Sequence, residues 1–258
     1  MTGLLEQHLR DRRDGGHKLL IPYITGGLTG QWTDAVEAAV AAGADAVEIG
    51  IPFSDPVMDG PTIQEASDRA LADGATPMSV LDDVRRLEVD VPLAVMTYYN
   101  LAFHSGLQRF AASLHEAGVS AAILPDMPLE ECEPWAEAAG EAGVEMILLA
   151  APTAPDDRLP RICERTQGFV YGVGLLGVTG ERAELAASAT EMAVRLKAVT
   201  DVPVLVGVGV STPAQAVEVC AHADGVIVGS AVVRRLLDGH GPEGVGDLVR
   251  EFRTALDR

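Results

Sequence analysis

Basic residues are scarce in this chain of 258 residues, which has 19 Lys and Arg against 38 Asp and Glu and a formal net charge of −19. A surface with this excess of negative charge repels nucleic acids and anionic membranes. We therefore expect neither as a partner. An anionic substrate would have to be held locally, by backbone N–H groups and helix dipoles, because the overall field opposes it.

Cysteine and long apolar runs are scarce as well. The three cysteines, Cys132, Cys163 and Cys220, are far apart and lack the spacing of metal ligands, which favours a reducing compartment. No apolar run approaches the length of a membrane span, and the charged, amphipathic N-terminus has no apolar signal core. We expect a cytoplasmic protein, and its 48% hydrophobic content is ample for a full core.

Strand and helix patterns alternate along the whole chain. The strands are expected at 19–24, 46–49, 93–98, 121–124, 145–149, 169–171, 204–206 and 226–228. The helices are expected at 2–13, 35–42, 62–72, 78–87, 107–117, 129–139, 156–165, 190–199 and 213–221, with a helical remainder. Eight βα units without a linker predict an α/β fold, a single-domain (β/α)8 TIM barrel over residues 1–258 with a short N-terminal helix. A doubly wound open sheet is the alternative, because strand order cannot be read from one sequence.

One predicted strand carries an acid and leads into an acidic loop. Glu48 lies among apolar residues of a strand expected to be buried on both faces, where desolvation raises the pKa of a carboxyl group. Asp55 and Asp59 follow on a loop at about 50–61, which we expect to be mobile, and Pro61 is suited to the first position of the next helix. This arrangement is typical of a general acid/base pair. A purely structural carboxylate at Glu48 and a Mg²⁺ site on Glu48, Asp55 and Asp59 are the alternatives, although no histidine supports a metal.

Glycine-rich loops follow the last three strands, at 177–180, 207–211 and 229–230. Free N–H groups between a strand end and a helix start bind phosphate oxygens, and the loops after strands seven and eight are a frequent phosphate site in barrels. We therefore expect phosphate here, with tight turns as the simpler alternative. The lone Gly207-Val208-Gly209 is not a dinucleotide fingerprint.

Three tyrosines, Tyr23, Tyr98 and Tyr171, end the first, third and sixth predicted strands. In a barrel these ends converge on one mouth, so the three rings indicate a pocket for a flat apolar group, with ordinary packing as the alternative. Asp126 follows the fourth strand and is either a loop cap or an interface acid.

The run from Glu48 to Gln64, EIGIPFSDPVMDGPTIQ, closely resembles the signature of the tryptophan synthase alpha chain family. The resemblance continues through YYNL at 98–101, Pro125-Asp126 with two following acids, GVTG at 177–180 and GSA at 229–231, and so spans nearly the whole chain. It implies a lyase of tryptophan biosynthesis that performs retro-aldol cleavage of indole-3-glycerol phosphate to indole and glyceraldehyde 3-phosphate, without metal or organic cofactor. It also implies a pyridoxal-phosphate beta subunit as partner, in a heterotetramer.

The resemblance further implies roles for individual residues. Glu48 would protonate the indole C3 and help to remove the hydroxyl proton, and Asp59 would accept the indole N–H and stabilise the positive ring. Tyr171 would line the pocket, and the loop with Thr179, in a segment at about 172–188, would act with the Asp59 loop as a mobile lid that excludes water. The remaining implied contacts are the backbone N–H groups that would hold the phosphate, those of Gly180, Gly209, Gly229 and Ser230.

Two departures from the family pattern stand out. Residues 172–176 lack the polar pair expected before GVTG, and Val208 stands where a phenylalanine commonly forms the indole wall. These departures leave open a stand-alone lyase that releases free indole in a specialised pathway, or a catalytically weak barrel that activates a beta subunit. A different phosphosugar barrel, an isomerase or epimerase, is a further alternative that leaves the run at 45–64 unexplained.

Overall fold

The computed structural model describes residues 2–174, 182–207 and 209–258. Nine strands are found among them: β1 (Leu19–Thr25), β2 (Val47–Gly50), β3 (Leu93–Met96), β4 (Val119–Ile123), β5 (Glu145–Ile147), β6 (Leu149–Ala150), β7 (Val170–Val173), β8 (Val204–Gly207) and β9 (Gly225–Val228). The first helices are α1 (Leu4–Asp14), α2 (Trp32–Ala41), α3 (Pro61–Ala72), α4 (Pro77–Val84), α5 (Tyr99–Ser105) and α6 (Leu107–Glu116). After the 3₁₀ turn η1 (Leu129–Glu131) come α7 (Glu133–Ala142), α8 (Leu159–Arg165), α9 (Arg182–Lys197), α10 (Pro213–Cys220), α11 (Ser230–Leu237) and α12 (Gly241–Leu256).

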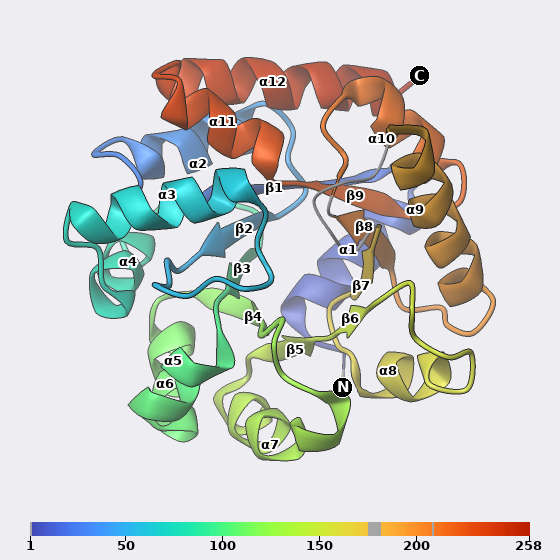
Figure 1. Ribbon diagram of the computed structural model, residues 1–258, viewed down its shortest axis with the longest axis horizontal. Coiled ribbons are helices and arrows are strands. Elements are labelled where there is room, and N and C mark those ends of the chain that lie inside the picture. The colour runs from blue at the N-terminus through green and yellow to red at the C-terminus, as the bar shows by residue number, and fades with distance from the viewer. Residues whose placement is uncertain (1, 175–181, 208) are drawn as a thin grey trace.

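The strands form one parallel sheet that curls into a barrel with the helices outside it (Figure 1). The sheet order runs from β5 through β4, β3, β2, β1, β9, β8 and β7 to β6. Its two edge strands are separated by Leu148 alone, and together they occupy the single strand expected at 145–149. β5 pairs with β4 and β6 with β7, so the fifth strand is divided between its two neighbours. The barrel prediction is confirmed, and the doubly wound alternative is wrong.

Several boundaries differ from the sequence prediction. Helix α5 was not expected, because 98–101 was read as a strand end and loop; its first amide is bound by an acid from another loop, which no local pattern reveals. The helix expected at 129–139 is divided into η1 and α7. The loop expected at about 172–188 is shorter, since β7 extends to Val173 and α9 begins at Arg182. Pro61 is the first residue of α3, as predicted.

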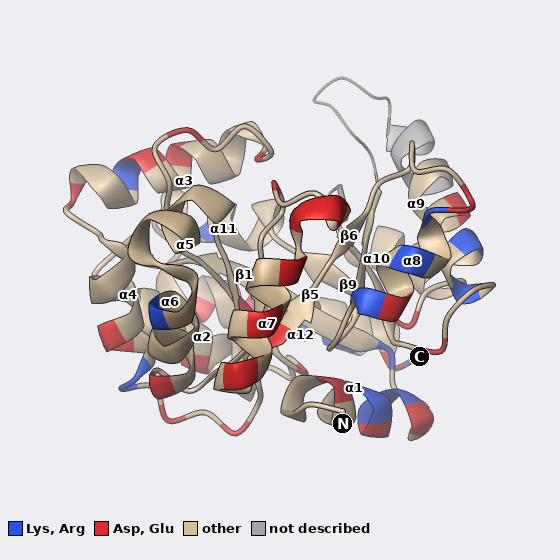
Figure 2. Cartoon of the chain, turned by 90° about the horizontal axis from the view of Figure 1, so that it is seen from below, with Lys and Arg blue, Asp and Glu red and all other residues tan. Residues whose placement is uncertain are grey.

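Helix α1 closes the end of the barrel where the strands begin, opposite α3 and α5 (Figure 2). Leu5 and Leu9 are fully buried and pack against inward-facing strand residues. The carboxylate of Glu145, at the start of β5, accepts hydrogen bonds from the amides of Leu5 at 2.7 Å and Glu6 at 3.0 Å. These bonds satisfy helix amides that have no partner within the helix, and so dock α1 on the barrel.

Two buried acids fasten neighbouring strands at the same end. The carboxylate of Asp45, which is 2% exposed, accepts hydrogen bonds from the amide of Leu20 at 2.8 Å, from Arg12 Nε at 2.7 Å and from Arg253 Nη1 at 3.2 Å. Asp224 binds an amide of β8 in the same way, with a lysine of α9 as its counter-ion. Because a buried charge is tolerated only when it is paired, both acids specify how strands and helices meet.

No helix in the described part of the chain is long and apolar enough to cross a membrane.

Candidate active site

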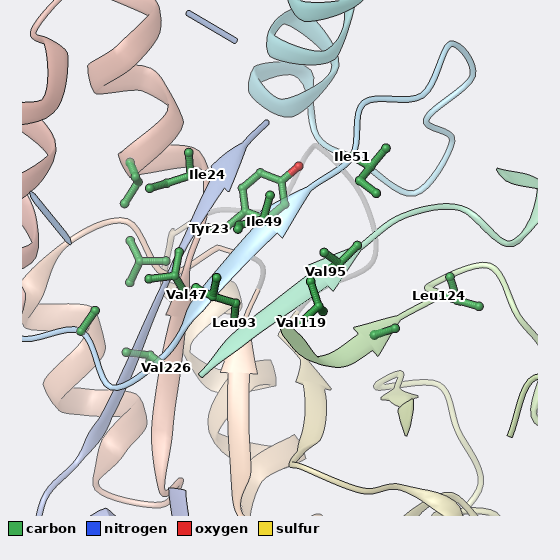
Figure 3. Close-up of a cluster of buried hydrophobic side chains, with 14 of the residues drawn as sticks. Tyr23, Ile24, Val47, Ile49, Ile51, Leu93, Val95, Val119, Leu124 and Val226 are labelled. Carbon is green, nitrogen blue, oxygen red and sulfur yellow. The ribbon is translucent and has the colours of Figure 1, made fainter. Parts of the chain in front are cut away.

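Glu48 lies in β2 with its side chain 1% exposed. Its neighbours Val47 and Ile49 belong to the layer between the barrel and the helices (Figure 3), and side chains alternate along a strand, so Glu48 points into the barrel. Neither carboxylate oxygen has a hydrogen-bond partner among the described residues. Burial, with a further contribution from the charge of Asp59, raises the pKa of Glu48 to about 8. Glu48 therefore carries a proton at neutral pH.

Asp59 lies on the loop between β2 and α3 and is half-buried. The hydroxyl of Tyr98 donates a hydrogen bond to Asp59 Oδ2 at 3.0 Å, and the side-chain Nε2 of Gln64 donates to the backbone oxygen of Asp59 at 2.9 Å. Burial raises the pKa of Asp59 to about 6, and the Tyr98 hydrogen bond partly opposes this rise. At neutral pH Asp59 is therefore ionised while Glu48 is protonated. Two carboxyl groups with separated pKa values are the arrangement that acid/base chemistry requires.

Tyr23 is buried on β1, the neighbour of β2, and Tyr171 is buried on β7, four strands from β2 in the sheet order. Each of the two rings lies over a glycine of the next strand. A Cβ atom on Gly50 would overlap the hydroxyl of Tyr23, and one on Gly207 would overlap the hydroxyl of Tyr171. Burial raises the pKa values of both phenols far above their usual range, and the two carboxyl groups, in their ionised forms, raise them further. The three predicted tyrosines thus surround the two acids. Gly50 was not among the predicted site residues.

The register of the sheet makes the two tyrosine–glycine contacts equivalent. Tyr23 is opposite Glu48, two residues before Gly50, and Tyr171 is opposite Leu205, two residues before Gly207. Figure 3 labels Tyr23 on β1, the strand beside β2. Glu48 thus occupies in β2 the position that an inward-facing leucine takes in β8. Gly50 could have been predicted as a site residue only from its position two residues beyond the partner of Tyr23. That position depends on the strand register, which the sequence alone does not supply.

The described phosphate candidates lie at the ends of β8 and β9. Gly229 precedes α11 and lies against the Tyr23 ring, and Ser230 is the first residue of that helix. Gly209 has a φ of +100°, a conformation that favours glycine. The amides of Ser211 and Thr212 donate to the side chain of Gln215, so the start of α10 is capped internally and that of α11 is the better anion site. Thr179, Gly180 and Val208 lie outside the described residues.

Asp126 and Asp55 have different surroundings. Asp126 Oδ1 accepts a hydrogen bond from the amide of Tyr99 at 2.8 Å, so it caps α5. Asp55 is exposed and accepts a hydrogen bond from the hydroxyl of Ser54 at 2.7 Å. Among the described residues no three His, Cys, Asp or Glu side chains are grouped so that they could hold a metal. The described residues therefore do not support the alternative of Mg²⁺ on Asp55 together with the two site acids.

Comparison with known proteins identifies the family. The model of the tryptophan synthase alpha chain family matches residues 9–252. This chain belongs to the tryptophan synthase alpha chain family. It is 44% identical to the tryptophan synthase alpha chain of Picosynechococcus sp. over 261 residues, which cover 99% of this chain and 98% of the relative. It is 45% identical to that of Streptomyces coelicolor, over 98% of this chain and 96% of the relative.

Solved structures agree with this assignment. A chain of Mycobacterium tuberculosis tryptophan synthase superposes with a TM-score of 0.91 at 36% identity, covering 99% of both chains. The tryptophan synthase alpha subunit of Legionella pneumophila superposes with a TM-score of 0.87 at 32% identity, covering 100% of this chain and 99% of that one. As a tryptophan synthase alpha chain, the protein is a carbon–carbon lyase, as the sequence predicted. The phosphosugar isomerase or epimerase alternative is wrong, and the comparisons do not favour the stand-alone or catalytically weak alternatives.

Proposed function

We infer that this chain cleaves indole-3-glycerol phosphate to indole and glyceraldehyde 3-phosphate, with Glu48 as its acid/base and Asp59 as the carboxylate beside the indole nitrogen. The observation that carries this assignment is the pair itself: a buried, protonated Glu48 and an ionised Asp59 whose charge acts on it, enclosed by three tyrosines. Family membership supplies the reaction, and the geometry of these side chains supports the roles.

The protonation states suggest an order of events. Protonated Glu48 donates its proton to C3 of the indole ring, and the resulting positive charge on the ring nitrogen is stabilised by ionised Asp59. Glu48, now a carboxylate, takes the proton of the hydroxyl on the carbon attached to C3. The O–H electron pair forms the aldehyde, and the electrons of the breaking C3–C bond restore the aromatic ring. Glu48 ends as it began, so one residue serves both proton transfers.

The phosphate would lie at the far side of this pair. We place it on the N–H groups of Gly209, Gly229 and Ser230, together with Gly180, while Gly207 provides space for Tyr171. Because Gly229 contacts Tyr23 and Tyr23 is opposite Glu48 in the sheet, an anion at the start of α11 would extend the substrate toward the acid pair. The excess of negative charge makes these few dipoles the main source of attraction for the phosphate. Thr179 and Val208 complete the substrate contacts we propose.

We also propose a tryptophan synthase beta subunit as partner, and the cytoplasm as compartment. The loop after β2 exposes Val57 and Met58, which are 80% and 48% exposed, and α5 exposes Phe103 at 65%. Apolar side chains beside the mouth are suited to contact with a subunit that receives indole. Asp55 adds a charge to this surface. If charge reversal by Asp55→Lys leaves co-purification with the beta subunit unchanged, Asp55 is not a contact.

Release of indole from indole-3-glycerol phosphate tests the activity directly. The unaltered chain should release indole with and without an added beta subunit, whereas Glu48→Gln should lower the rate about 100-fold or more, the usual contribution of a general acid. Glu37→Gln, an exposed glutamate on α2, is the matched control and should keep full activity. Equal turnover by Glu48→Gln would remove Glu48 from the mechanism. Absence of indole from the unaltered chain under both conditions would refute the proposed function.

A further inference from the structure

The hydroxyl of Tyr98 lies between the backbone and the side chain of the acidic loop. It accepts a hydrogen bond from the amide of Met58 at 2.9 Å and donates one to Asp59 Oδ2 at 3.0 Å. A phenol has one proton to donate and lone pairs to accept, so both bonds form at once. The Met58 amide, the Tyr98 hydroxyl and the Asp59 carboxylate therefore form a chain of two hydrogen bonds, each donated toward the carboxylate.

Two further contacts fix the Tyr98 ring in place. The ring stacks on Phe53, near the start of the same loop, with centroids 4.9 Å apart and planes 25° apart. Tyr98 is also the N-cap residue of α5, and the next amide, that of Tyr99, is bound by Asp126. The ring is 4% exposed. Tyr98 thus holds the loop at two places, near its start through the Phe53 ring and near its end through the hydroxyl. Tyr98 is itself held in place, because it follows β3 and the next amide is bound by Asp126 after β4.

The hydrogen bonds also distinguish the two oxygens of Asp59. Oδ2 is occupied by Tyr98, whereas Oδ1 accepts no hydrogen bond from any residue that the structure describes. A carboxylate with one oxygen bound is limited to one orientation, and its other oxygen is available to a ligand donor. The sequence predicts only that the Tyr98 ring lies at a strand end. The hydrogen bond of its hydroxyl to Asp59 is seen only in the structure.

We propose that the Tyr98 hydroxyl is a positioning group: it latches the loop at residues 51–60 over the mouth and orients Asp59 so that Oδ1 faces the N–H of the substrate. This inference rests on the proposed function for the identity of the substrate donor. The latch itself concerns only residues of this chain.

The titratable groups that face Asp59 come from four elements. They are Glu48 on β2, Tyr23 on β1, Tyr171 on β7 and Tyr98 after β3. Tyr98 is the one whose hydrogen bond lowers the pKa of Asp59, against the effect of burial. Its removal raises that pKa, so a larger fraction of Asp59 becomes protonated near pH 6.

Tyr98→Phe tests the latch, since it removes the hydroxyl and keeps the ring that stacks on Phe53. Tyr99→Phe is the matched control, because its hydroxyl bonds to no residue in the described part of the chain. In Tyr98→Phe we expect the acid limb of kcat/KM for indole release to move up by about one pH unit, with a loss of about fivefold at pH 6 from ionisation alone. We also expect the Met58 amide to exchange its hydrogen about fivefold faster, because its acceptor is gone. Tyr99→Phe should change neither quantity.

The two measurements separate this inference from the proposed function. An acid limb that stays in place in Tyr98→Phe overturns the positioning role, and unchanged exchange at Met58 overturns the latch. An equal effect of Tyr99→Phe on either quantity overturns both, because it would show that any nearby phenol matters. If the unaltered chain releases no indole, the proposed function fails by itself, and the exchange of the Met58 amide still decides whether the latch exists.

Discussion

Replacement of Glu48 by Gln should make the protein more stable while it abolishes most of its activity. The side chain is 1% exposed, and its pKa is raised from 4.5 to about 8. Between these two values the unfolded chain has released a proton that the folded chain still holds. The associated stability is therefore fully present below pH 4.5 and is lost as the pH rises to about 8.

The size of the effect follows from the two pKa values. Their separation corresponds to about 5 kcal/mol of unfolding free energy at the alkaline limit, since each pKa unit is worth about 1.4 kcal/mol. Glutamine has nearly the same shape and no charge, so it does not carry this pH-dependent loss. We expect Glu48→Gln to exceed the unaltered chain by about 1 kcal/mol at pH 5 and by about 4 kcal/mol at pH 8.

Unfolding by guanidinium chloride, followed by circular dichroism at pH 5 and pH 8, measures this difference. Glu37→Gln is the control: this glutamate is exposed on α2 and belongs to no ion pair in the described residues, so its effect should not depend on pH. A difference between Glu48→Gln and the unaltered chain that stays constant from pH 5 to pH 8 would refute the reasoning, because Glu48 would then not be held protonated in the fold.

Three further outcomes are expected. The rate of indole release should follow a bell-shaped pH profile, rising as Asp59 ionises near pH 6 and falling as Glu48 loses its proton near pH 8; a profile flat from pH 5 to pH 9 contradicts both assignments. Asp45→Ala should lower the unfolding free energy by about 3 to 5 kcal/mol, because the buried Leu20 amide loses its acceptor, Arg12 loses its ion-pair partner and Arg253 keeps only Asp257. Asp82→Ala, from an exposed ion pair, should cost less than about 1 kcal/mol in the same denaturation experiment. Gly50→Ala should cost about 1 to 3 kcal/mol through overlap with the tyrosine hydroxyl above it, and unchanged melting would show that this contact relaxes freely.

The barrel was predictable because its evidence is local. Each strand–helix unit is marked by apolar periodicity and by breakers within a few residues, so the order of elements follows from short windows of sequence. Pro61 at the first position of α3 is one such local feature. The burial of Glu48 was predictable for the same reason, since the apolar residues on both sides of it in the chain indicate a strand covered on both faces.

Features that depend on strand register were not predictable. The division of the fifth strand between β5 and β6 arises where the barrel closes, and α5 is capped by an acid from the following strand's loop. The contact of Tyr23 with Gly50 needs β1 and β2 in one particular register. A shift of either strand by one residue would move these side chains to opposite faces.

By itself, the sequence determined the eight-unit barrel, the placement of an acid inside its second strand and the family to which the chain belongs. Only the tertiary structure decided which hydroxyl binds which carboxylate oxygen: Tyr98 and Asp59 are 39 residues apart in the chain and meet because their strands are neighbours in the sheet. Local sequence specifies what a segment can form, since its signals act over a few residues. The alignment of side chains from different strands is specified by the packing of the whole barrel, and the pKa values of the two acids depend on that packing.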